Sequence, residues 1–276
     1  MATEDKGQCP KAILITPAYN EEETIATIAE SGLRMVREGV VADFLVIDDG
    51  SADRTANIAE KMGAKVMRIG KNAGKGNAFL QGALYCKRSG ADVLVIVDAD
   101  ILEPLKSETV KKMILGVGAR GENGQVIGMV ICPAIEEQNW IGWDISGQRA
   151  ISMKALNFLF GVENAELCKS KPAKRFEKMA MGYGLERALN YAITGKMLSA
   201  GHTWTHCGRL AFLEEEDMIR FKRSYRTDGG RDVRQKDEAE RTRIMIAKRA
   251  DHARRLVKIR KVKWVGRTLA RVMAKF

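Results

Sequence analysis

The chain has 276 residues, of which 45% are hydrophobic and 29% are charged, which is the ordinary composition of a soluble globular protein with one sizeable core. Its five cysteines form no Cys-x-x-Cys pair, which argues against a disulfide framework or a zinc site and favours a reducing, cytoplasmic location. No window approaches the roughly 18 to 20 apolar residues of a membrane span, so we expect any membrane contact to be peripheral.

The first predicted elements are two strands that end in polar residues. An apolar run over residues 12–16 stops at Pro17-Ala18-Tyr19-Asn20, and acidic residues from Glu21 onward favour the start of a helix. A second run over residues 44–47 ends in the same way at Asp48-Asp49-Gly50-Ser51 and leads into another helix. Ligands gather where the strands of an open parallel sheet end, so these tips are candidate site residues.

The next two segments add a lysine loop and a pair of carboxylates. Lys75 is flanked by glycines and opens a predicted helix, where backbone N–H groups and an ammonium can meet a phosphate. The apolar run over residues 93–97 then leads directly into Asp98 and Asp100, which share a side of the extended chain. Two such carboxylates are typical of a site that binds a divalent cation, which in turn binds a diphosphate.

Strands and helices alternate as far as residue 118, which predicts a doubly wound α/β domain with a mostly parallel sheet flanked by helices. A further strand is predicted over residues 126–132 and a helix over residues 145–160. The basic stretch over residues 169–178 is predicted to be a loop that folds over donor or acceptor.

The chain changes character near residue 221, where a polar linker begins. We therefore divide it into a domain over residues 1–220 and an extension over residues 221–276. From residue 241 onward there are thirteen Lys and Arg against one acid, and apolar residues recur at three- or four-residue steps, which predicts a basic amphipathic helix. Three uses stay open: packing on its own domain, binding an anionic membrane surface, or binding nucleic acid. No specific motif supports the last.

Four segments resemble the family 2 glycosyltransferases in order and spacing, and two later segments resemble further parts of that family, the last of them found in some members. They are P-A-Y-N-E-E at 17–22, D-D-G-S-A-D-R-T at 48–55, N-A-G-K-G-N-A at 72–78, V-D-A-D at 97–100, S-G-Q-R-A at 146–150 and G-Y-G-L-E at 182–186. The similarity extends to dolichyl-phosphate-mannose synthases and glucosyl-3-phosphoglycerate synthases. It implies a GT-A fold, a nucleotide-sugar donor with uridine or guanosine, and Mg²⁺ or Mn²⁺ as cofactor.

The resemblance also implies roles for individual residues. Those expected to bind the nucleotide are Pro17, Ala18, Tyr19, Glu21, Asp48, Asp49, Lys75, Asp98 and Ala99. Within that set, Asp49 would accept a hydrogen bond from the base and Lys75 would approach the ribose or diphosphate. The expected metal ligands are Asp98, Asp100 and His206, and the expected catalytic residues are Asp144, Glu186 and Arg149.

Asp144 or Glu186 would be the general base, and Arg149 would bind an anionic group of the acceptor unless it is a surface helix charge. For the acceptor, a polyprenyl-phosphate or other lipid at the cytoplasmic membrane face is the first hypothesis. A small phosphorylated metabolite and a nucleic-acid base are the alternatives. A non-enzymatic protein that kept a degenerate site, binding nucleotide or nucleic acid, belongs to a different class. A nucleotidyltransferase would need a glycine-rich first loop, and Pro17 to Glu22 occupies that place.

Overall fold

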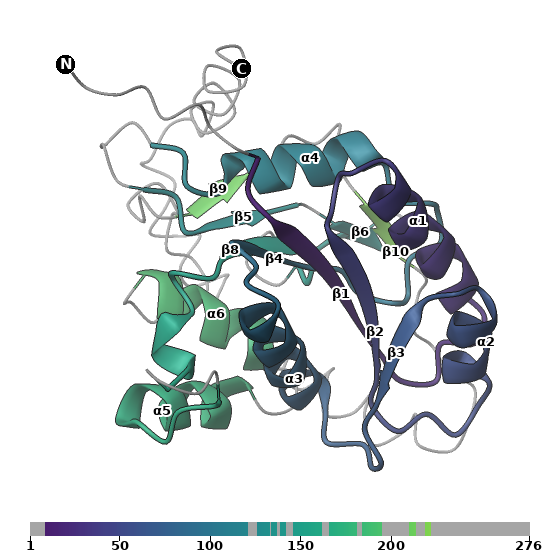
Figure 1. Cartoon of the computed structure of the whole chain (residues 1–276), viewed down its shortest axis with the longest axis horizontal. Coiled ribbons are helices and arrows are strands. Elements are labelled where there is room, and N and C mark those ends of the chain that lie inside the picture. The colour runs from purple at the N-terminus through teal and green to yellow at the C-terminus, as the bar shows by residue number, and fades with distance from the viewer. Residues whose placement is uncertain are drawn as a thin grey trace.

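The structure is a computed structural model that describes residues 9–120, 126–132, 134–136, 139–141, 146–161, 166–180, 184–194, 210–213 and 219–221. A seven-stranded sheet in the order β3-β2-β1-β4-β8-β5-β9 forms its centre (Figure 1). Its strands are β1 (Ala12–Ala18), β2 (Asp43–Asp48), β3 (Lys65–Arg68), β4 (Val93–Ile96), β5 (Met129–Ile131), β8 (Arg149–Ser152) and β9 (Leu210–Phe212). In this sheet β8 runs antiparallel to both β4 and β5, while the other described pairs are parallel. The predicted mostly parallel α/β fold is confirmed.

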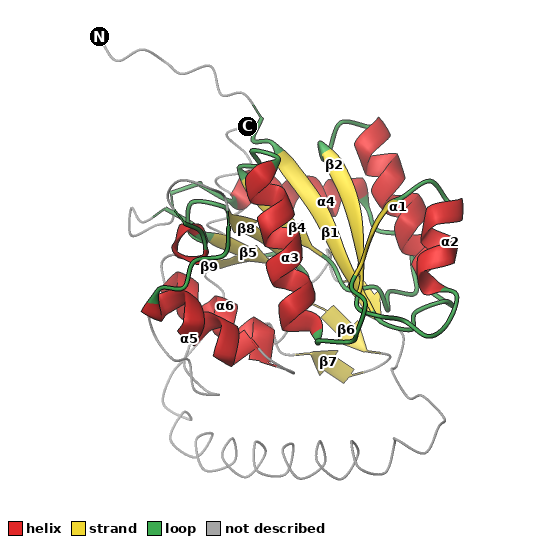
Figure 2. Cartoon of the chain, turned by 60° about the horizontal axis from the view of Figure 1, so that its bottom comes forward, coloured by secondary structure: helices red, strands yellow, loops and turns green. Residues whose placement is uncertain are grey.

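Helices cover both faces of the sheet (Figure 1). On one face lie α1 (Ile25–Arg37), α2 (Thr55–Lys61) and α4 (Ser107–Gly116). On the other lie α3 (Lys75–Arg88), the 3₁₀ helix η1 (Asn157–Leu159), α5 (Lys171–Ala180) and α6 (Leu185–Thr194). A shorter sheet, in the order β10-β6-β7, consists of β6 (Ala134–Glu136), β7 (Asn139–Ile141) and β10 (Ile219–Phe221) (Figure 2).

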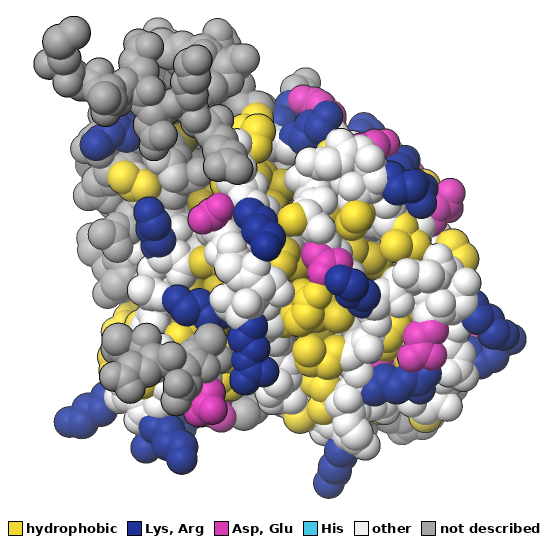
Figure 3. Space-filling model, in the orientation of Figure 1, with side chains coloured by type: hydrophobic (Ala, Val, Ile, Leu, Met, Phe, Trp, Pro, Cys, Tyr) yellow, Lys and Arg dark blue, Asp and Glu magenta, His cyan; other side chains and the backbone are white. Residues whose placement is uncertain are grey.

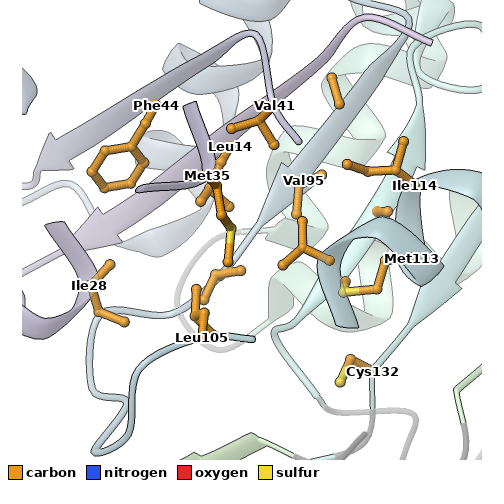
Figure 4. Packing of buried hydrophobic residues seen from close by; sticks show 14 of the residues in the cluster. Leu14, Ile28, Met35, Val41, Phe44, Val95, Leu105, Met113, Ile114 and Cys132 are labelled. Carbon is orange, nitrogen blue, oxygen red and sulfur yellow. The ribbon is translucent and has the colours of Figure 1, made fainter. Parts of the chain in front are cut away.

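The alternation of side chains along each strand divides the core into two layers. Leu14 and Val95 join Met35 of α1 and Met113 of α4 in one cluster (Figure 4). Their strand neighbours face the opposite cluster under α3, α5 and α6. Central strands that are buried on both faces explain the continuous apolar runs in the sequence.

Glycine allows α3 to lie directly on the sheet. A Cβ at Gly82 would come within 2.5 Å of Ile15 Cδ1 and 2.6 Å of Ile47 Cδ1. The close approach holds α3 against β1 and β2, and the helix begins at Lys75.

Two local predictions are wrong. The helix expected over residues 145–160 is instead strand β8 followed by a turn and η1. Its predicted inward residues, such as Leu156 and Leu159, are buried, but the backbone groups of residues 149–152 pair with β4 and β5, so tertiary pairing outweighs local periodicity.

The basic stretch expected as a loop contains helix α5. Ala173, Phe176 and Ala180 face inward at three- and four-residue steps, and the basic side chains occupy the outer face. The strand expected over residues 126–132 is confirmed as β5.

Apart from Phe221, which ends β10, the basic extension lies outside the described residues, so the division at residue 220 stays a prediction. Among the described residues, no helix is both long and apolar enough to cross a bilayer.

Candidate functional site

The carboxyl ends of β1, β2 and β4 bring the polar tips together. Parallel register places Ala18 beside Asp48, and hydrogen bonds then join the two following loops. Asn20 N donates to Ser51 Oγ at 2.8 Å, and Ala52 N donates to Asn20 Oδ1 at 2.7 Å. The loops that follow β1 and β2 are therefore joined by hydrogen bonds at the carboxyl edge of the sheet, between residues that lie 31 and 32 positions apart in the sequence.

Asp49 holds the loop that precedes Lys75 at the same edge of the sheet. Its buried carboxylate accepts hydrogen bonds from Ala73 N at 3.0 Å and Gly74 N at 2.7 Å. Gly50 follows with a φ of +76° and has no room for a Cβ, because Asn72 N would lie 2.7 Å away. Asp48 is also buried and accepts from Ser51 N at 3.2 Å. Both carboxylates therefore shape the loops, and the predicted bond from Asp49 to a base stays a prediction.

Lys75 connects three elements at the start of α3. Its Nζ lies 2.7 Å from Asp98 Oδ1, after β4, and 2.8 Å from Glu186 Oε1, on α6. Burial opposes the charge of the ammonium, but the two carboxylates outweigh it and raise the pKa of Lys75 well above its usual value. The lysine is therefore a fixed positive charge at the end of β4.

Asp100 lacks compensation for part of its charge. Its Oδ1 is buried and accepts no hydrogen bond from the part of the chain that the structure describes. Burial, together with the nearby charges of Asp98 and Glu21, raises the pKa of Asp100 to about 7, although Lys75 opposes this shift. A buried, unpartnered carboxylate oxygen is costly unless a cation or a proton compensates it. Asp100 therefore fits the predicted role of metal ligand.

A complete ligand set is not visible among the described residues, because no three His, Cys, Asp or Glu there are grouped closely enough to hold a metal ion. The predicted ligand His206 and the predicted base Asp144 both lie outside the described residues.

Arg149 differs from its prediction. Its side chain is fully buried in β8, where Nε donates to Ser146 O at 2.7 Å and Nη1 donates to Asn190 Oδ1 of α6 at 2.5 Å. It is neither a surface helix charge nor accessible to an acceptor anion in this arrangement. Arg149 instead joins β8 to α6 from inside the protein.

Glu186 lies between two cations. Burial alone would raise the pKa of its carboxyl group, but Lys75 and Arg149 outweigh burial and lower that pKa. A general base works best when its pKa lies near the operating pH, so Glu186 is a weak base while both cations face it. The remaining predicted nucleotide contacts are near this region: Pro17 and Ala18 end β1, Tyr19 is 38% exposed, and Ala99 is buried between the two aspartates.

Gln148, Gly147 and Asn190 are site residues that sequence reasoning missed. Gln148 Nε2 donates to Asp98 Oδ2 at 3.1 Å, and Gly147 leaves the space that the same carboxylate fills. The signal was present for the first two, since both stand in the S-G-Q-R-A segment. Their partner 50 residues earlier is known only from the pairing of β4 with β8.

Comparisons with known proteins agree with this geometry. Residues 13–127 match the family described as glycosyl transferase family 2, a segment that holds Asp49, Lys75, Asp98 and Asp100. A 116-residue stretch is 33% identical to the 4,4'-diaponeurosporenoate glycosyltransferase of Staphylococcus aureus, covering 40% of this chain and 29% of that protein. The chain thus matches less than a third of this curated relative.

Solved structures extend the fold comparison beyond residue 127. Glucosyl-3-phosphoglycerate synthase from Mycobacterium tuberculosis, crystallised with Mn²⁺, UDP-glucose and phosphoglyceric acid, gives a TM-score of 0.54 at 22% identity, over 79% of this chain and 74% of that one. The same enzyme with Mg²⁺ and UDP gives a TM-score of 0.53 at 20% identity, over 81% and 74% of the two chains. At this identity the likeness shows the fold, which is of the GT-A type.

Proposed function

We propose that the protein transfers a sugar from a nucleotide-sugar donor to an acceptor, because residues 13–127 match the model of glycosyl transferase family 2. The observation that carries the proposal is the meeting of Asp98, Asp100 and Lys75 at the end of β4. A metal-bound diphosphate requires carboxylates that bind the metal and a cation that binds the phosphates. Asp98, Asp100 and Lys75 supply these groups at the carboxyl edge of a mostly parallel sheet.

We assign the divalent cation, Mg²⁺ or Mn²⁺, to Asp100, with Asp98 beside it and His206 as a predicted further ligand. The neighbouring structures with these metals and UDP support the assignment, as does the unpartnered Oδ1 of Asp100. When bound, the cation would supply Lewis-acid stabilisation of the departing nucleoside diphosphate. UDP-sugars are the first donors to test, because UDP is the nucleotide in those structures.

Lys75 would hold the donor through its diphosphate. In this arrangement its ammonium contacts Asp98 and Glu186, and the metal would compete with it for Asp98 when the donor binds. Lys75 would then contact the phosphate oxygens, whose charge grows as the glycosidic bond to the nucleotide breaks. The proton of an acceptor hydroxyl would pass to Asp144 or Glu186. No base is needed if the acceptor is a phosphate that is already ionised.

The proposed acceptor carries an anionic group, with a lipid phosphate as the first choice and a small phosphorylated metabolite as the second. Exposed basic residues on the outer face of α5 support an acid: Lys171, Lys174, Arg175 and Lys178. Figure 3 shows dark blue side chains where Figure 1 places this helix. The end of α5 touches the start of α3, since a Cβ at Gly76 would lie 2.1 Å from Ala180 O. The names of the diaponeurosporenoate glycosyltransferase and the glucosyl-3-phosphoglycerate synthase also point to acidic acceptors for those proteins.

The donor assignment is tested by thermal unfolding with a panel of nucleoside diphosphates and nucleotide sugars, with and without Mn²⁺ or Mg²⁺. Binding to the native state raises the unfolding temperature, so one base should give a shift that requires the metal. If no donor shifts a folded sample, the donor site is degenerate and the enzymatic proposal fails.

The acceptor class is tested with the donor found in this way, by offering a polyprenyl phosphate in vesicles and 3-phosphoglycerate in solution. Replacing Lys171, Lys174 and Lys178 together by Gln should raise the KM for the acceptor and leave donor binding unchanged. The matched control is the same change at the exposed residues Lys61, Lys106 and Lys111, which lie on or beside α2 and α4. Equal KM values for the acceptor in the two triple variants would mean that the basic side chains of α5 do not bind the acceptor.

A further inference from the structure

Gln148 lies directly beside the aspartate that ends β4. The register of β4 and β8 pairs Ile96 with Arg149, so its continuation places Gln148 opposite Val97 and Gly147 opposite Asp98. Gln148 is fully buried. A buried primary amide is costly unless its polar atoms find partners, so the contacts of this side chain show what holds it there.

Both ends of the Gln148 amide bind Asp98. Oε1 accepts from Asp98 N at 2.9 Å, and Nε2 donates to Asp98 Oδ2 at 3.1 Å. A flipped amide would place N–H₂ against the backbone N–H and oxygen against the carboxylate, so this orientation satisfies both contacts. The amide holds the backbone and the side chain of Asp98 simultaneously, which restricts the carboxylate to one direction.

The surroundings prevent Asp98 and Gln148 from moving as a pair. A Cβ at Gly147 would lie 2.1 Å from Asp98 Oδ2, so the carboxylate fills the space that this glycine leaves. Gln148 O accepts from Cys132 N at 3.0 Å, and Ser146 Oγ donates to Cys132 O at 2.6 Å. Lys75 contacts the other carboxylate oxygen, Oδ1.

We propose that Gln148 is a positioning residue, which sets the direction of the Asp98 carboxylate toward the metal and nucleotide through the two hydrogen bonds of its amide. The proposal rests on the proposed function, because it concerns the same donor site. Groups that orient the residues around a metal typically affect its affinity about 10- to 100-fold when they are changed.

The test measures Mn²⁺ binding in the presence of UDP, by the electron paramagnetic resonance signal of free Mn²⁺, alongside the thermal unfolding temperature. Gln148→Glu keeps the size of the side chain but places an oxygen against Asp98 Oδ2, so it isolates the N–H donation. Gln148→Leu removes both bonds. We expect each variant to bind Mn²⁺ with UDP about 10- to 100-fold more weakly than the wild type.

Gly147→Ala is a second route to the same result if the Gln148 variants do not fold. It removes no hydrogen-bonding group, but its methyl group would displace the Asp98 carboxylate, so we expect a similar loss of Mn²⁺ affinity. The control is Tyr85→Phe, which removes a 2.5 Å bond from Tyr85 Oη to Asp43 Oδ2 at the amino edge of the sheet. It should lower the unfolding temperature and leave Mn²⁺ affinity unchanged.

The outcomes separate this inference from the proposed function. Wild-type affinity in the folded Gln148 or Gly147 variants would overturn the positioning role and leave the proposed function standing. A wild-type protein that binds neither Mn²⁺ nor any nucleoside diphosphate of the panel would overturn the proposed function and, with it, the inference. If Tyr85→Phe also loses Mn²⁺ affinity, the loss in the Gln148 variants is explained by general destabilisation of the protein. That result would likewise overturn the positioning role.

Discussion

At the scale of single residues, the charges at the carboxyl edge of the sheet are compensated unevenly. Lys75 and Gln148 hold both oxygens of Asp98, whereas Asp100 Oδ1 has no hydrogen-bond partner among the described residues. Sites that bind ligands often keep such unfavourable groups at a cost in stability. Asp100 is therefore where stability and function oppose each other most directly.

Asp100→Asn should raise the unfolding temperature of the metal-free protein and remove metal-dependent nucleotide binding. The neutral amide ends the repulsion with Asp98 and Glu21, which is part of what raises the pKa of Asp100. A gain of about 1 kcal/mol is expected from a single relieved charge contact. Thermal unfolding with and without Mn²⁺ and UDP measures both effects. A variant that still shows the full metal-dependent shift would remove Asp100 from the ligand set.

Glu186→Gln should release Lys75 on one side and weaken the link between α3 and α6. If Glu186 is the general base, turnover falls much more than donor affinity, typically about 10²- to 10⁴-fold. If it only holds Lys75, the KM for the donor changes while kcat changes little. Steady-state kinetics with the identified donor distinguishes the two roles.

At the scale of elements, the start of α3 connects the fold to the site. Asp49 holds the preceding loop, Gly82 presses the helix onto β1 and β2, and the backbone of Gly76 lies against Ala180 of α5. The two glycines remove side chains where an element must approach another closely. A small change in either contact would move Lys75.

Gly76→Ala should destabilise the protein by about 1 to 3 kcal/mol, because its methyl group would meet the carbonyl of Ala180 at 2.1 Å and force α3 from α5. Gly70→Ala is the matched control, since a Cβ there meets nothing within 4 Å. Denaturant unfolding compares the two. Equal free energies of unfolding would mean that the α3 and α5 contact adjusts without strain.

At the scale of the whole molecule, the polar groups at the amino edge of the sheet differ in role from those at its carboxyl edge. Polar pairs at the amino edge stabilise the fold: Asp43 Oδ2 lies 2.6 Å from Lys65 Nζ, and Lys11 N donates to Asp92 Oδ2 at 2.9 Å. The carboxyl edge holds the residues proposed for donor binding. Changes at the amino edge should therefore alter stability without altering donor affinity.

The pH dependence of stability tests this division. Burial alone would raise the pKa of Asp43, but hydrogen bonds from Lys65 and Tyr85 outweigh it, so the folded pKa lies below the usual value of an aspartate. Stability from this carboxylate is therefore present above about pH 4 and is lost as the pH falls through the lowered folded pKa. Lys65→Met should reduce that acid-dependent loss by about 1 kcal/mol or less, because Lys65 is mostly exposed and solvent screens the pair. Urea unfolding from pH 7 to pH 2.5 measures the difference, and parallel curves would contradict it.

The extension over residues 221–276 is predicted to contain a basic amphipathic helix. We propose that it brings the protein to an anionic membrane surface, because the thirteen Lys and Arg of residues 241–276, together with a recurring apolar stripe, can add charge attraction to apolar burial. The full chain should bind phosphatidylserine vesicles more tightly than a chain that ends at residue 235, and salt should weaken the difference. Equal binding by the two would exclude the membrane role.

The sequence by itself determined the mostly parallel α/β fold, the strand that ends at Asp48, the strand that precedes Asp98 and Asp100, and the helix that starts at Lys75. These features follow from local patterns: apolar runs with polar ends, glycines around a lysine, and helical spacing. The segments that resemble family 2 glycosyltransferases predicted the same strands and helix in the same order. A short-range pattern suffices for them because each element is formed largely by contiguous residues.

Only the tertiary structure decided what each charged group faces. Arg149 and Gln148 stand in one motif, yet strand pairing buries the first against α6 and directs the second to Asp98. The same pairing made a strand where periodicity predicted a helix. Charges and hydrogen bonds act between atoms a few ångströms apart, and residues 50 or 111 positions apart in the chain come that close only when the sheet and its helices assemble.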